Sequence, residues 1–262
     1  MPNQTYQSHP ERVTSLSSKK GKATIAALTA YDYPTAKILD ETGIDLILVG
    51  DSLGMVVLGH NDTTEVTIEM MIHHTSACRP AVKNAALVAD LPYKSYDTPE
   101  KAIITSNSLV KAGADGVKLE GGTEIIPQIN AIIDNGIPVI GHVGLLPQSI
   151  KIEGSYKKKG KSPEEYSRIL ADAISLEKAG AVAIFLENIV SELASEITNE
   201  LKIPTIGIGS GIDCNGQIRV IHDITGFFPW FTPSFADPLC NIANEISLAV
   251  EKYIKSTYSC VI

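Results

Sequence analysis

The sequence predicts an α/β fold in which eight parallel strands and their connecting helices close into a (β/α)8 TIM barrel. Its length of 262 residues is close to the roughly 250 residues that one such barrel requires. Strand-like and helix-like segments alternate along the chain, which implies a parallel sheet. No break in composition divides the chain, so we expect one domain over residues 1–262, with residues 1–22 as an N-terminal arm.

The predicted strands are short apolar runs, several of them without polar alternation. The clearest run is LILV at residues 46–49, followed at once by Gly50, Asp51 and Ser52. A continuous apolar run is typical of a strand buried on both faces. The eight predicted strands are residues 23–30, 46–49, 85–90, 116–120, 138–142, 183–187, 204–209 and 218–221. Eight strands in a chain of this length favour a closed barrel over an open sheet.

The predicted helices begin at good capping residues. Thr67, Thr98 and Ser162 each stand at a helix start with a glutamate close behind, which suits an N-cap and the first turn. The predicted helices are residues 33–42, 67–79, 99–111, 124–134, 163–178, 191–201 and 239–253, with a short one near 12–17. We expect loops over residues 54–66 and 143–162.

Composition restricts the class of partner. The formal net charge is -8, which argues against nucleic acid as a ligand because nucleic-acid binding needs a basic surface. No apolar run approaches the ~20 residues of a membrane span, and the N-terminus lacks a signal-peptide core. The 4 cysteines have no metal-ligand spacing, as in a reduced cytoplasmic protein. We therefore predict a cytoplasmic protein that acts on small molecules, with no nucleic-acid or membrane partner.

Four predicted strands finish on an acid. Asp51, Asp90 and Glu120 follow three adjacent strands, and Glu187 ends a strand further round. The carboxyl ends of all barrel strands lie on the face that carries the active site. Three unpaired carboxylates there would raise each other's pKa, and a hard cation with oxygen ligands, such as Mg²⁺, relieves that repulsion. The alternative is that each acid caps a helix or pairs with a lysine.

Other polar residues near these acids have two interpretations each. Lys118 points the same way as Glu120 and either neutralises a substrate carboxylate or forms a Schiff base; neighbouring acids favour an ammonium. Glu187 is a candidate general base. His142 is either a hydrogen-bonded core residue or part of the site. The glycine-rich loop 207–211 either cradles an anion or makes a tight turn.

Six motifs resemble one enzyme family. In chain order they are TAYDY at 29–33, LVGDSLGM at 48–55, ADLP at 89–92, VKLEGG at 117–122, GHVGLLPQS at 141–149 and IGIGSG at 206–211. Together they resemble ketopantoate hydroxymethyltransferase (3-methyl-2-oxobutanoate hydroxymethyltransferase) of pantothenate and coenzyme A biosynthesis. The resemblance implies a barrel of the phosphoenolpyruvate/pyruvate type and a large homo-oligomer, typically a homodecamer. Segment 227–238 matches this family poorly.

The resemblance also implies roles for individual residues. The implied Mg²⁺ ligands, direct or through water, are Asp51, Asp90 and Glu120. The implied contacts of the oxoacid substrate are Asp51, Ser52, Asp90 and Lys118. Glu187 is the implied proton acceptor. His142 and Ser210 are candidate site-lining residues, although the family commonly has alanine where this chain has Ser210.

The implied reaction transfers a hydroxymethyl group from 5,10-methylenetetrahydrofolate to 3-methyl-2-oxobutanoate. It passes through a Mg-stabilised enolate and yields 2-dehydropantoate. The first alternative is an isocitrate-lyase-like or phosphonopyruvate-type lyase or mutase of the same barrel superfamily. Those enzymes often carry a Cys-Gly-His segment, which this sequence lacks. The second alternative is a catalytically silent barrel that serves as an assembly subunit.

Overall fold

The computed structural model describes residues 7–154, 157–231, 233 and 235–259. The first six residues of the predicted arm, and residues 232 and 234 of the divergent segment, lie outside that description. The chain divides into two compact units, residues 1–218 and 219–262. Each is described by itself, and a single domain over the whole chain stays a prediction.

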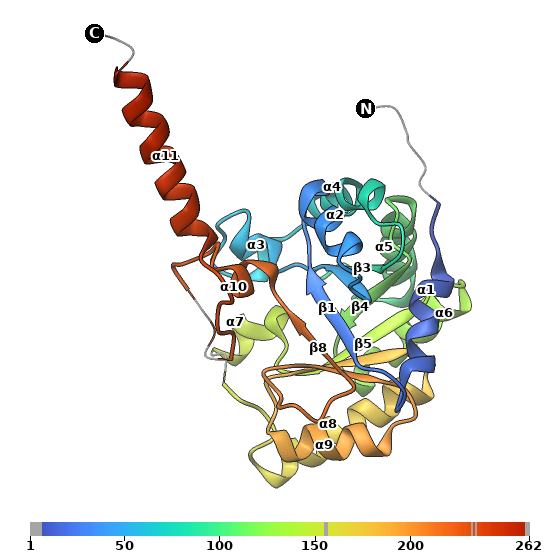
Figure 1. Ribbon diagram of the computed structural model, residues 1–262. Helices are drawn as coiled ribbons and strands as arrows, with labels where there is room; N and C mark the ends of the chain where they lie inside the picture. The colour runs from blue at the N-terminus through green and yellow to red at the C-terminus, as the bar shows by residue number, and fades with distance from the viewer. Residues whose placement is uncertain (1–6, 155–156, 232, 234, 260–262) are drawn as a thin grey trace. The chain divides into compact units, whose positions relative to one another are not determined.

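The strands form a closed barrel, as predicted. In the described part of the chain, eight strands lie side by side in sequence order, and the pairings from β1 through β8 are parallel. Figure 1 shows helices surrounding this ring of strands. The strands are β1 (Ile25–Thr29), β2 (Leu46–Val49), β3 (Ala86–Asp90), β4 (Gly116–Glu120), β5 (Val139–Gly144), β6 (Ala183–Glu187), β7 (Thr205–Ile208) and β8 (Gly216–Arg219).

The helices of the first unit connect these strands. They are α1 (Pro10–Ser15), α2 (Tyr33–Glu41), α3 (Leu53–Val56), α4 (Ile68–Cys78), α5 (Pro99–Lys111), α6 (Ile126–Asp134), α7 (Ile150–Glu153), α8 (Pro163–Lys178) and α9 (Ser191–Glu200). Single 3-10 turns are η1 (Leu16–Lys19), η2 (Thr63–Glu65), η3 (Arg79–Ala81), η4 (Thr123–Ile125) and η5 (Pro147–Ser149). The predicted N-caps are confirmed, because the side chains of Thr67, Thr98 and Ser162 each accept a backbone N–H of the first turn.

Several predicted boundaries were wrong. The predicted loops 54–66 and 143–162 contain α3 and η2, and η5 and α7. Helices of three or four residues are too short to show an apolar period, and they form only through tertiary contacts. Strand β8 begins at Gly216, two residues before the predicted start, because a Cβ at this glycine would lie 2.4 Å from the Ile25 carbonyl oxygen. The glycine therefore permits close pairing where no apolar side chain marks a strand.

The second unit, residues 219–262, carries two helices in its described part. They are α10 (Ile221–Thr225) and α11 (Ile242–Ser259). Helix α10 follows β8 directly and was not predicted, and α11 starts later and ends later than the predicted 239–253. In the residues that the structure describes, neither unit has a helix long and apolar enough to cross a membrane.

The barrel core is built from alternate strand residues. Leu46 and Leu48 of β2, for example, point inward with their counterparts on the other strands, as the two-residue period of a strand requires. Val13 and Leu16, from α1 and η1, join the same buried cluster. Ser17 donates its hydroxyl hydrogen to the Val182 carbonyl just before β6 (2.8 Å). The predicted arm therefore includes a helix that closes the amino-terminal end of the barrel.

Candidate active site

The side chains that point into the barrel are apolar along most of each strand. Near the carboxyl ends of several strands they are charged. In β3, Val88 belongs to the apolar cluster and Asp90 is the next residue with the same direction. The strand register places Asp90 opposite Lys118 and places Glu120 opposite His142. Parallel pairing therefore brings charged side chains from three neighbouring strands into contact inside the barrel.

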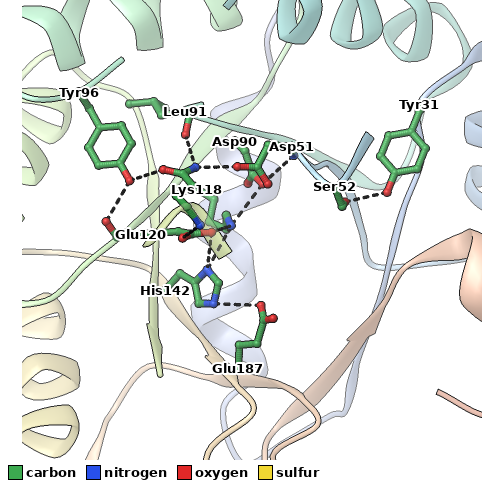
Figure 2. A network of polar contacts seen from close by, with 11 residues as sticks. Tyr31, Asp51, Ser52, Asp90, Leu91, Tyr96, Lys118, Glu120, His142 and Glu187 are labelled. Carbon is green, nitrogen blue, oxygen red and sulfur yellow. Dashed lines mark hydrogen bonds and ion pairs between the residues drawn. The ribbon is translucent and has the colours of Figure 1, made fainter. Parts of the chain in front are cut away.

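Lys118 lies at the centre of this cluster (Figure 2). Its Nζ is 3.2 Å from Asp90 Oδ2, 3.4 Å from Glu120 Oε1 and 3.2 Å from His142 Nδ1. The side chain is 4% exposed. Burial alone would lower the pKa of Lys118, but the Asp90 and Glu120 carboxylates raise it above its ordinary value. Lys118 is therefore an ammonium, which favours charge neutralisation over Schiff-base chemistry.

Asp51 and Asp90 lie against each other at the ends of β2 and β3. The Asp51 backbone N–H donates to Asp90 Oδ2 (3.1 Å). A Cβ at Gly50 would lie 2.9 Å from Ser52 Oγ and would therefore displace the Ser52 hydroxyl. Burial, and then the Asp90 and Glu120 charges, raise the pKa of Asp51 well above its usual range. Burial also raises the pKa of Asp90, even against the Lys118 ammonium. The Lys118 charge therefore offsets the rise in both pKa values only in part.

The donor set fits Mg²⁺. Asp90 Oδ1 is buried and has no hydrogen-bond partner among the described residues. In the same part of the chain, no three acidic, imidazole or thiol groups converge closely enough to hold an ion by themselves. Mg²⁺ commonly takes only one or two protein carboxylates and completes its octahedron with water and substrate oxygens. Asp51, Asp90 and Glu120 therefore suit ligation of Mg²⁺, directly or through water.

His142 connects the lysine to Glu187. Its Nδ1 faces Lys118 and Glu120, and its Nε2 lies 3.2 Å from Glu187 Oε2. Burial and the Lys118 charge oppose protonation, but contacts with Glu120 and Glu187 raise the pKa of His142 to about 9. Both the imidazolium and the neutral tautomer that accepts from Lys118 carry a proton on Nε2. His142 Nε2 therefore carries a proton beside the Glu187 carboxylate, in an ion-pair contact that lacks the geometry of a hydrogen bond.

Glu187 is the most accessible acid of the cluster. Its side chain is 17% exposed, whereas the Asp90 and Glu120 side chains are each 2% exposed. It stands at the carboxyl end of β6, opposite Gly144 on one side and Ile208 on the other. Glu187 thus contacts His142 through one oxygen and is partly exposed to solvent.

The two candidate serines differ. The Ser52 hydroxyl lies 2.8 Å from the Tyr31 hydroxyl beside Asp51 and appears in Figure 2 next to the cluster. The Ser210 hydroxyl donates to the Leu186 carbonyl (2.7 Å) and accepts from the Ile189 N–H (3.2 Å). Ser210 therefore joins the backbone segments after β6 and β7. The structure brings the other predicted site residues into one group and leaves the Ser210 hydroxyl outside it.

Two participants were not predicted. Gln148, in η5, contacts both Asp51 and Glu120, and Tyr96 contacts Gln148 and the Glu120 carbonyl. Neither residue ends a strand, and neither is charged at neutral pH, so no pattern of acids or strand ends marks them. The only available signal was the position of Gln148 inside the motif at 141–149.

Comparison with known proteins identifies close relatives over nearly the whole chain. A model of the ketopantoate hydroxymethyltransferase family matches residues 11–259. The protein named 3-methyl-2-oxobutanoate hydroxymethyltransferase from Acetivibrio thermocellus is 52% identical over 91% of this chain and 85% of its own length. The protein of that name from Trichodesmium erythraeum is 50% identical over 90% of each chain, and that from Enterococcus faecalis is 48% identical over 93% and 89%.

Solved structures with the same fold are more distant in sequence. Phosphoenolpyruvate phosphomutase from Streptomyces platensis aligns with a TM-score of 0.67 at 14% identity, over 95% of this chain and 88% of that one. Phosphonopyruvate hydrolase in complex with oxalate and Mg²⁺ aligns with a TM-score of 0.64 at 14% identity, over 96% and 87%. These structural similarities confirm the type of barrel. At this sequence identity they do not extend to activity or to the roles of residues.

Proposed function

The chain belongs to the ketopantoate hydroxymethyltransferase family of enzymes, and from that premise we propose its substrates, cofactor and residue roles. The proposed reaction joins the one-carbon unit of 5,10-methylenetetrahydrofolate to C3 of 3-methyl-2-oxobutanoate. One water is consumed and supplies the new hydroxyl oxygen. The products are 2-dehydropantoate and tetrahydrofolate. Mg²⁺ is the proposed cofactor.

The observation that carries this proposal is the excess of buried carboxylates around a single ammonium. Lys118 lies between Asp90 and Glu120, and Asp90 Oδ1 has no partner among the described residues. Such a site favours a divalent cation together with a ligand that offers its own oxygens. When bound, Mg²⁺ supplies Lewis-acid polarisation of the oxoacid's ketone and so makes the C3 proton easier to remove. A distant fold neighbour has been solved with oxalate and Mg²⁺.

Glu187 is the proposed general base. Its carboxylate takes the C3 proton, and the electrons of that C–H bond pass into the enolate. The contact with His142 at 3.2 Å supports this role, because a charged imidazole attracts the carboxylate and limits its movement. In the proposed complex the exposed side of Glu187 faces the substrate, whereas Asp90 and Glu120 are buried against Lys118.

Lys118 and Ser52 are the proposed holders of the oxoacid. The Lys118 ammonium binds the substrate carboxylate and adds positive potential next to the developing enolate oxygen. Ser52 contributes its hydroxyl, which Tyr31 keeps in place (2.8 Å). The enolate C3 then forms the new bond to the methylene carbon as the bond from that carbon to one folate nitrogen breaks, and this nitrogen takes the proton held by Glu187. Water then replaces the second nitrogen on the same carbon, so that its OH becomes the new hydroxyl, its remaining proton goes to the nitrogen, and tetrahydrofolate leaves. Because Lys118 keeps its proton throughout, its role is electrostatic.

Formation of 2-dehydropantoate tests the reaction. The protein is incubated with 3-methyl-2-oxobutanoate, methylenetetrahydrofolate and Mg²⁺, and the product is quantified by mass spectrometry. The proposal expects product that disappears when folate is omitted or EDTA is added. Absence of product would overturn it, and turnover of phosphonopyruvate instead would restore the lyase or mutase alternative. A homodecamer, also proposed from the family resemblance, is tested by size-exclusion chromatography with light scattering.

A further inference from the structure

Gln148 occupies a buried position over the acidic cluster. It lies in η5, the turn that follows β5, and is 4% exposed. Its backbone N–H donates to Glu120 Oε2 (3.1 Å). Its side-chain Nε2 donates to Asp51 Oδ2 (2.7 Å) and to the Leu91 carbonyl (2.9 Å). One residue therefore ties together the carboxyl ends of β2, β3 and β4.

The orientation of this amide is determined by its partners. Asp51 Oδ2 and the Leu91 carbonyl accept hydrogen bonds, so the NH₂ group must face them. The Tyr96 hydroxyl donates to Gln148 Oε1 (2.7 Å) on the opposite side. Figure 2 draws these contacts as dashed lines from Tyr96, Leu91 and Asp51 to the amide. Rotation of the amide by 180° would turn its oxygen onto the Asp51 and Leu91 oxygens and lose both of those bonds, so the amide has one favoured orientation.

A neutral donor is what this position requires. The Asp51 carboxylate lies next to Asp90, and the Asp51 backbone N–H already donates a hydrogen bond to the Asp90 carboxylate. Without a side-chain donor, repulsion between the two carboxylates favours rotation of Asp51 away from Asp90. A lysine here would neutralise the acids and compete with a cation. The amide of Gln148 orients Asp51 without cancelling its charge.

We propose that Gln148 is a positioning residue, held by Tyr96, that fixes the Asp51 and Glu120 carboxylates in the geometry that binds Mg²⁺. The proposal rests on the metal-binding role given to these acids above. Gln148 touches neither Glu187 nor His142 among the contacts of the described residues. Loss of the Gln148 side chain should therefore weaken metal and oxoacid binding more than it slows proton removal.

The test compares two glutamine-to-methionine variants. Gln148→Met keeps the length of the side chain and removes the amide's hydrogen bonds to Asp51, Leu91 and Tyr96, whereas the backbone N–H that donates to Glu120 stays. Gln128→Met makes the same change at another buried glutamine, on α6, whose amide donates to the Asp97 carbonyl (3.4 Å). Binding of Mg²⁺ alone is measured by isothermal titration calorimetry, and folding is checked by circular dichroism and thermal unfolding.

We expect Gln148→Met to bind Mg²⁺ about 10- to 100-fold more weakly, the usual effect of losing a residue that orients metal ligands. Gln128→Met should bind as wild type does. The KM for 3-methyl-2-oxobutanoate should rise in Gln148→Met by more than kcat falls. A merely structural role would lower the melting temperature and leave the Kd for Mg²⁺ unchanged.

Tyr96→Phe provides a second variant that keeps Gln148 and removes one hydroxyl. It should weaken Mg²⁺ binding by about fivefold, as expected for one neutral hydrogen bond. Wild-type affinity in both Gln148→Met and Tyr96→Phe would overturn the positioning role and leave the proposed function intact. Failure of the wild-type protein itself to bind Mg²⁺ would overturn the metal assignment, and the inference with it.

Discussion

The two ends of the barrel both bury a cation against acids, but they do so differently. At the amino-terminal end, Arg79 Nη1 lies 2.9 Å from Asp115 Oδ1 and also donates to the Gly113 carbonyl. Asp115 in turn accepts the backbone N–H groups of His9 and Leu87. Neither Arg79 nor Asp115 has a buried polar atom that lacks a partner among the described residues. One charge balances one charge there.

The carboxyl-terminal end has no such balance. Lys118 faces both Asp90 and Glu120, Asp51 adds a further acid, and Asp90 Oδ1 is left without a partner in the described part of the chain. The pKa of Asp51 is raised well above its ordinary value, chiefly by burial. A buried ion pair indicates structure when its hydrogen bonds are complete. It indicates function when acids are in excess and an oxygen stays open.

Removing the cation at the amino-terminal end should have the largest effect on stability. Arg79→Met leaves Asp115 buried and unpaired, which costs about 3–5 kcal/mol of the free energy of unfolding. Urea unfolding measures this loss, with Lys83→Met on the exposed surface nearby as the control. The folded fraction should keep the wild-type Kd for Mg²⁺, and a weaker Kd would mean that the two ends are not independent.

Removing the cation at the carboxyl-terminal end should abolish function. Lys118→Met takes away the group proposed to bind the oxoacid carboxylate, and we expect kcat/KM to fall about 100-fold or more. This corresponds to the roughly 2–5 kcal/mol that loss of one partner of a buried charge pair costs. Steady-state kinetics at saturating Mg²⁺ measures it. Activity within a few fold of wild type would remove Lys118 from the mechanism.

Mg²⁺ should stabilise only through the carboxyl-terminal acids. At a concentration 100 times its Kd, the ion should add about 2.7 kcal/mol to the free energy of unfolding. Thermal unfolding with and without MgCl₂ measures this gain in the wild type, in Asp90→Asn and in Arg79→Met. Asp90→Asn should lose the gain and Arg79→Met should keep it. A full gain in Asp90→Asn would end the assignment of Asp90 as a ligand.

The smallest effect is a pH dependence at the amino-terminal end. Burial raises the pKa of Asp40, but N–H donors of Ala85, Asn84 and Lys83 outweigh it, and the pKa is lowered below 3.8. The ionised form therefore stabilises the fold above pH 3.8, and this stability is lost as pH falls through the lowered pKa. Asp40→Asn should be less stable at neutral pH by about 1.5 kcal/mol. The gap between variant and wild type should close on acidification; a constant gap would contradict this account.

Much of the fold and of the cluster followed from the sequence, because parallel strands place their carboxyl ends on one face. Asp90, Glu120 and Glu187 each end a strand as predicted, and α8 has its predicted bounds because Ser162 marks its start. The closing helix at the amino-terminal end was not foreseen as core. Val13 and Leu16 are only two apolar residues in a polar segment, too few for a periodic signal.

The parts that could not be predicted depend on tertiary contacts. Gln148 is uncharged and lies in a segment predicted as loop, and only the folded chain brings its amide to Asp51. The Ser210 hydroxyl is occupied by backbone groups on β6 and β7, which no local pattern reveals. The acids at strand ends can be located from the sequence. The neutral groups that orient these acids reach them only when the chain is folded and packed.

The central claim is that Glu187 removes the C3 proton at the carboxyl-terminal end of the barrel. The most direct measurement follows that proton by NMR in D₂O, with 3-methyl-2-oxobutanoate and Mg²⁺ and no folate, for the wild type and Glu187→Gln. We predict exchange catalysed by the wild type, and loss of about 10²- to 10⁴-fold in rate in the variant with oxoacid binding retained. Exchange at the wild-type rate in Glu187→Gln would contradict the claim and assign proton removal to another group.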